Sequence, residues 1–350
     1  MNGFGSMLKE YLEFHKISQT DFASRLDISV KHMNEILNEN TNISEELMLA
    51  ISLITDIDVN FIFYVENKKR IYNYLMNNFK TTANINKFLN SFCLKEMSNK
   101  GWITLKDSES FSQNAMDLLN YLNVANFDIF DNYVDNKVFY KKKNDADLKK
   151  VYLWIKRCDY LISNQNVTIY KSSNLKLLLE ELEIERNKDF DVSKLVSIFN
   201  KYGIYLVVCD ALEGSKVRGC MLVKDNNPAI YMTRYLKEKS SFYFALYHEI
   251  GHIKSDYNVL KNKIIVDDGD SKEQKADLFA INQMIKPSVW DLIINNYSEK
   301  EKICNINNIP LCFLYSRLAK EGYISYSSDE YQSHRVKIGL WVIWELLVDF

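Results

Sequence analysis

The chain has 350 residues, of which 47% are hydrophobic and 26% are charged, with a formal net charge of −2. This length suits two or three domains, and the composition allows each of them a buried core. Because the chain is almost neutral, it has no global positive field for nucleic acids, and such binding would need a local patch.

Few helix breakers interrupt the chain, which holds 3 prolines and 10 glycines. We therefore expect a mostly helical α+β protein. The apolar runs are too short or too interrupted to span a bilayer, and the first residues lack a signal-peptide pattern. The six cysteines include no C-x-x-C pair and should be free thiols. We expect a cytoplasmic protein without membrane contact.

Residues 1–70 show the apolar spacing of a five-helix domain. Ser18 and Ser29 each precede a short amphipathic segment and are predicted N-caps. Small Ala23 lies where these two short helices must approach each other. The pattern predicts a helix-turn-helix.

The segments 17–29 and 33–38 resemble the helix-turn-helix of XRE-type phage repressors and HigA-like antitoxins. In that family the third helix enters the major groove of operator DNA. The resemblance implies that the start of this helix contacts DNA bases, through Ser29, Val30, Lys31 and His32. It implies that the DNA backbone is contacted by Gln19, Asn34 and Asn38, from the preceding helix and the later part of this one.

Local charge opposes strong DNA binding, because residues 1–70 hold seven basic and eleven acidic side chains. Glu39 also stands where the family usually has a glycine. Weak operator binding would then require a homodimer. The alternative is a helix-turn-helix that serves as a protein-docking surface.

Residues 71–170 alternate amphipathic helices with polar breaks and are predicted to be a helical connecting region. Residues 171–350 are predicted to be a third, zincin-like domain. Short β-rich runs at 204–209, 219–223 and 229–232 suggest a small antiparallel sheet there. An edge strand of such a sheet could pair with an extended peptide.

The clearest chemical signal is the motif H-E-I-G-H at residues 248–252, within a segment of helical composition. His248 and His252 are one turn apart, so both imidazoles can reach one zinc ion. Glu249 lies beside them, where it can act as general base without being a ligand.

A zinc peptidase needs a third protein ligand. Glu273 and Asp277 are one turn apart on a predicted helix downstream, so Glu273 can bind zinc while Asp277 orients a ligand histidine. Asp267, Asp268 and Asp270 are rival ligands in a predicted loop. We prefer Glu273, because a helix holds a ligand more rigidly.

The H-E-I-G-H motif, followed by the segment 273–280 that reads E-x-x-A-D-x-F-A, is similar to the ImmA/IrrE family of zinc metallopeptidases. Residues 284–287, 309–318 and 322–324 extend the similarity, and segments 101–103 and 153–155 resemble proteins that fuse an XRE helix-turn-helix to this peptidase. The resemblance implies cleavage of a repressor or antitoxin encoded nearby, in a phage, mobile-element, defence or stress-response circuit.

The motif predicts that zinc activates water and that Glu249 moves the proton to the leaving amine. Tyr247, Tyr231 and His334 are candidate oxyanion donors. The alternative is a transcriptional regulator or HigA-like antitoxin whose zinc site is structural or sensory. We favour the enzyme, because a structural site needs no general base.

Overall fold

The computed structural model describes residues 3–106, 111–127, 129–130, 138–140, 147–258, 264–266 and 271–338. The chain divides into two compact units, Met1–Asn126 and Phe127–Phe350. The division lies inside the predicted connecting region of residues 71–170. Each unit has its own hydrophobic interior.

The first unit begins with the predicted five helices: α1 (Phe4–Phe14), α2 (Gln19–Arg25), α3 (Val30–Leu37), α4 (Glu45–Thr55) and α5 (Val59–Phe79). Ser18 caps α2 and Ser29 caps α3, as predicted, through hydrogen bonds from the amides of Asp21 and His32. The apolar faces of α2 and α3 are buried in one core. The predicted boundary near residue 70 lies within α5, which continues to Phe79.

Three further helices are described in this unit: α6 (Thr82–Asn90), α7 (Leu94–Asn99) and α8 (Phe111–Leu122). Ile85 and Leu118 are fully buried, and α5 packs against both α6 and α8. The mostly helical prediction for this stretch is confirmed.

Glu39 has a structural role inside the first unit. Its backbone is left-handed, with φ of 63°, and its carboxylate accepts a hydrogen bond from the Ser6 amide at 2.8 Å. Lys69 Nζ lies 2.5 Å from the same carboxylate. Burial raises the pKa of Glu39, but its hydrogen bonds with Lys69 and Ser6 outweigh burial and lower it overall. The Glu39 carboxylate therefore holds the start of α1 in place, so one of the acidic side chains of residues 1–70 has a role within the fold.

The second unit contains a five-stranded sheet of order β1-β5-β3-β4-β2. The strands are β1 (Val138–Tyr140), β2 (Tyr205–Cys209), β3 (Gly219–Lys224), β4 (Asn227–Thr233) and β5 (Ile264–Val266). β3 and β4 form a hairpin whose turn residues, Asp225 and Asn226, both have positive φ. Asn and Asp tolerate this conformation, which suits a two-residue hairpin turn.

The sheet is mixed, so the prediction of an antiparallel sheet was wrong. β2 pairs with β4 in parallel and β1 with β5 in parallel, whereas β3 is antiparallel to both of its neighbours. Helices cover both faces, and every residue of β4 is buried. Parallel pairing is characteristic of sheets covered in this way.

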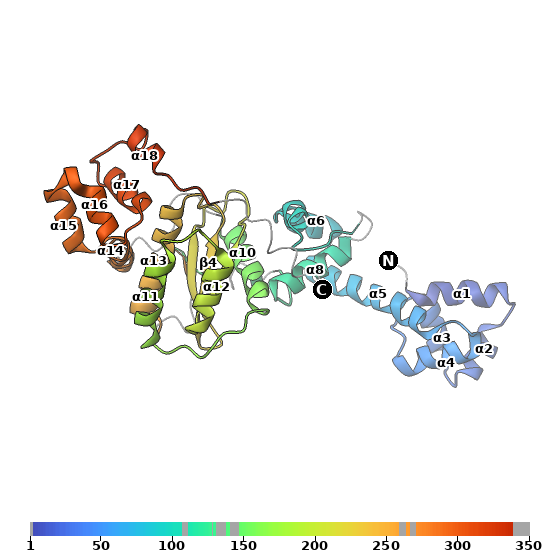
Figure 1. Ribbon diagram of the computed structural model, residues 1–350. Coiled ribbons are helices and arrows are strands. Elements are labelled where there is room, and N and C mark those ends of the chain that lie inside the picture. The colour runs from blue at the N-terminus through green and yellow to red at the C-terminus, as the bar shows by residue number, and fades with distance from the viewer. Residues whose placement is uncertain are drawn as a thin grey trace. The chain divides into compact units, whose positions relative to one another are not determined.

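The two faces carry different helices (Figure 1). α10 (Leu148–Ile162) covers one face, where Trp154 meets Tyr231 edge-on at 6.3 Å. α12 (Val192–Lys201) and α13 (Lys239–Asp256) pack on the other, against Ile230 and Met232. α11 (Asn174–Glu185) packs beside α12. Alternate residues of β4 thus enter different cores.

The remaining helices gather beside α13 (Figure 1): α14 (Ser271–Met284), α15 (Pro287–Asn295), α16 (Lys300–Ile306), α17 (Leu311–Lys320) and α18 (Asp329–Ser333). All six cysteines are free, as predicted. Among the residues that the structure describes, no helix is long and apolar enough to cross a membrane.

Candidate metal centre

The centre lies where α13 and α14 pack closely together. A Cβ atom at Gly251 would lie 3.1 Å from the Cα of Ala276, so a side chain there would require the two helices to move apart by a few tenths of an ångström. The short distance brings the start of α14 against the histidine face of α13. The glycine within H-E-I-G-H therefore has a packing function.

Three side chains meet at this crossing: His248, His252 and Glu273. Their ligand atoms all lie within 4.8 Å of one another. Glu273 Oε2 is 3.0 Å from His248 Nε2, and Glu273 Oε1 is 3.0 Å from His252 Nε2. The structure thus brings together the three predicted ligands, and they could hold a metal ion.

The contacts within this group fit a bound cation. Glu273 Oε1 is buried and has no hydrogen-bond partner, although it is close to His252 Nε2. The two Nε2 atoms are themselves 3.1 Å apart. A buried carboxylate oxygen and two imidazole nitrogens, all facing one point, are the donor set of a divalent transition metal.

Each histidine is oriented by a carboxylate at its outer nitrogen. Asp277 Oδ1 is 2.9 Å from His248 Nδ1, as the sequence predicted. Asp256 Oδ2 is 3.4 Å from His252 Nδ1, a role that the sequence analysis missed. Asp256 is four residues after His252 on the same helix, and this spacing could have revealed it. Such partners fix the tautomer that presents Nε2 to a metal.

The electrostatics of the metal-free protein show how strongly these groups interact. Burial alone would lower the pKa of His248, but its hydrogen bonds with Asp277 and Glu273 raise it to about 10. The pKa of His252 is also raised, since its contact with Glu273 outweighs burial. The same contacts hold the pKa of Glu273 well below its usual range, against the effect of burial. A metal ion must therefore compete with protons for both imidazoles.

Glu249 lies close to both histidines and is only 7% exposed. Its charge raises the pKa of each of them. On its other side is β3, where a Cβ at Gly219 would lie 3.0 Å from Glu249 Oε1. The predicted base thus lies between the histidines and the first residue of a strand.

The other predicted residues of this site have separate surroundings. The Tyr231 hydroxyl donates to Asp159 at 2.7 Å, and Tyr247 is buried in the core of the unit. His334 stacks on Tyr315 with ring centroids 4.0 Å apart. The rival ligands Asp267, Asp268 and Asp270 lie outside the described residues.

In the first unit, the predicted DNA-contacting residues lie at both ends of α3 and at the start of α2. Val30, Lys31 and Asn34 are exposed, and Gln19 and His32 are half-buried. Ser29 uses its hydroxyl as the cap of α3, while the Asn38 amide donates to Asn34. His32 is 3.7 Å from Glu35, so its positive charge when protonated is partly offset.

No protein-family model, curated protein or solved structure matches this chain.

Proposed function

We propose that this protein is a zinc-dependent endopeptidase that cuts a regulatory protein, a repressor or an antitoxin encoded nearby. One observation carries the proposal: His248, His252 and Glu273 converge on a single point, with Glu249 beside them. The resemblance to ImmA/IrrE peptidases supports the substrate class.

Zinc held by these three residues would supply a Lewis acid for a peptide carbonyl and for water. Glu249 is placed to accept the proton of the attacking water and to deliver it to the leaving amine. Asp277 and Asp256 keep both imidazoles in position throughout. Gly219 leaves space next to the base at the start of β3.

The site favours catalysis over a purely structural or sensory role. Structural zinc sites close all four positions with protein ligands. Among the residues that the structure describes, the ligand group here has three members. A hydrolase uses a carboxylate beside the ligand pair as its general base, whereas a structural site does not require one.

For the first unit we propose an XRE-like helix-turn-helix that binds operator DNA. The exposed, capped start of α3 supports this role. Duplex carrying the gene's own promoter should be retarded at low salt, and Lys31→Glu should weaken the shift. If wild-type protein gives no shift at low salt, the unit is a protein-docking module instead.

The test of the peptidase is a comparison of protein N-termini in cells that produce the wild-type protein or Glu249→Gln, with and without DNA damage or phage challenge. The substitution removes the base and should lower cleavage by about 10²–10⁴-fold. Both proteins should contain the same amount of metal. A new N-terminus that requires Glu249 identifies the substrate, whereas matching profiles under every condition favour the regulator.

A further inference from the structure

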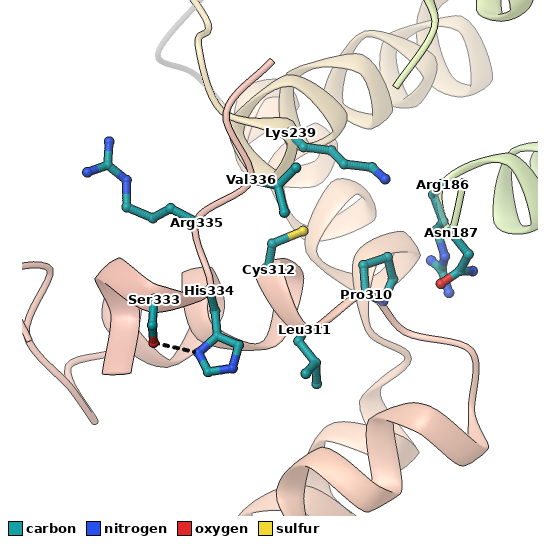
Figure 2. A pocket seen from close by; sticks show the side chains of 10 residues that line it. All are labelled: Arg186, Asn187, Lys239, Pro310, Leu311, Cys312, Ser333, His334, Arg335 and Val336. Carbon is teal, nitrogen blue, oxygen red and sulfur yellow. Dashed lines mark hydrogen bonds between the residues drawn. The ribbon is translucent and has the colours of Figure 1, made fainter. Parts of the chain in front are cut away.

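A second site lies in the C-terminal unit, at a cavity of about 300 Å³. It is open to one side and is bordered by the ends of α11 and α18 and the starts of α13 and α17 (Figure 2). Among the residues that the structure describes, the lining has no acidic side chain and includes three lysine or arginine side chains, Arg186, Lys239 and Arg335. A volume of this size suits a small molecule.

Lys239 is a buried cation at this cavity without a direct ion pair among the described residues. Its side chain is 6% exposed, and its ammonium donates to the Lys188 carbonyl at 2.6 Å. No carboxylate among the described residues lies within ion-pair distance of it, although Asp189 and Glu185 act on it from farther away. Burial lowers the pKa of Lys239 and outweighs the opposing effects of Cys312, Asp189 and Glu185. A buried ammonium without a counter-ion is costly.

Arg186 also lines the cavity and adds positive charge to it. It is 2% exposed and donates mainly to backbone carbonyls, those of Gln283 and Asn308 among them. Its one carboxylate contact, with Glu183, is 3.4 Å long, and its buried Nε has no hydrogen-bond partner.

The third cation does not contribute directly. Figure 2 shows the Arg335 guanidinium pointing away from the cavity, and Glu238 pairs with it at 2.5 Å. In the same view Lys239 extends toward Arg186 and Asn187. The excess charge at the cavity is therefore that of Lys239, supported by Arg186.

We propose that this cavity binds a small molecule through a phosphate group that pairs with Lys239. Lysine binds phosphate as a point charge, and Lys239 opens an 18-residue helix, whose N-terminal end favours anions. Pro310, Leu311 and Val336 offer apolar contact to the organic part of the ligand. Lys239 is roughly 13 Å along α13 from His248, so this site is distinct from the metal centre.

Thermal unfolding of the full chain tests the proposal, with inorganic phosphate and acetate as probes at constant ionic strength. Phosphate should raise the wild-type midpoint by a few degrees in a saturable manner. Lys239→Met should abolish the shift and Lys239→Arg should keep most of it. Lys237→Met is the matched control, because Lys237 is an exposed neighbour.

The outcomes separate the alternatives. A shift that persists in Lys239→Met places the phosphate elsewhere, including the metal centre, and overturns the proposal. A shift with acetate but not phosphate overturns the phosphate assignment. If Lys239→Met does not fold, calorimetry replaces it: no saturable phosphate binding to the wild-type protein, or wild-type affinity in a Lys239→Gln variant, overturns the proposal. None of these readouts requires peptidase activity.

Discussion

The structure adds Asp256 to the residues that the sequence predicted for the candidate metal centre. It accepts from the Ser255 hydroxyl at 2.8 Å and faces His252 Nδ1. We expect Asp256→Asn to lower zinc affinity about 10–100-fold, because the imidazole loses the group that fixes its tautomer. Competition with a chromophoric chelator measures the affinity.

The matched control for this change is Asp291→Asn, at an exposed position of α15. It should leave zinc affinity unchanged. Equal affinities in Asp256→Asn and the wild-type protein would show that His252 needs no carboxylate partner.

Individual residues of the centre were predictable where helical spacing alone decides their position. His248, His252 and Glu249 share one helix, so their proximity follows from the motif. Glu273 and Asp277 were predicted from their spacing on a downstream helix, and the structure brings both to the histidines. The role of Glu39 could not be predicted, because its partners Ser6 and Lys69 are distant in sequence.

At the scale of elements, the α13–α14 crossing determines whether Glu273 reaches the histidines. We expect Gly251→Leu to push α14 away and to abolish stoichiometric metal binding, since overpacking of this kind costs about 1–3 kcal/mol. Gly251→Ala should weaken zinc binding to a smaller extent. Metal content and zinc affinity of the purified variants give the measurement.

The alanine variant distinguishes packing from helix propensity. Alanine stabilises a helix interior relative to glycine by about 1 kcal/mol when no neighbour is close. If Gly251→Ala binds zinc as tightly as wild-type protein and unfolds at higher temperature, the crossing does not control the site.

For the sheet, the positions of strands are easier to predict from the sequence than their pairing. The segments of β2, β3 and β4 were located correctly, because short apolar runs and turn residues mark them, whereas the three-residue strands β1 and β5 were missed. The pairing of the strands was not predicted, since the chain passes from β2 to β3 over the position between them, and β4 then returns to fill that position. Strand direction depends on this long-range arrangement and on the helices that cover both faces.

At the scale of the whole molecule, the two compact units separate the helix-turn-helix prediction from the metal chemistry. The metal ligands and the phosphate-binding cavity both belong to the second unit. The helical and α+β character of the chain followed from its few breakers and its apolar spacing. The position of the division did not, because no composition change marks it in the sequence.

The most direct test of the account is the metal content of the purified full chain, measured by elemental mass spectrometry. We expect about one zinc per chain in the wild-type protein and in a variant with Asp267, Asp268 and Asp270 changed to Asn. Glu273→Gln should lose most of the metal while it remains folded to the same extent as the wild-type protein. Zinc retained in full by Glu273→Gln, or lost from the triple Asn variant, would contradict the ligand set on which the proposed peptidase rests.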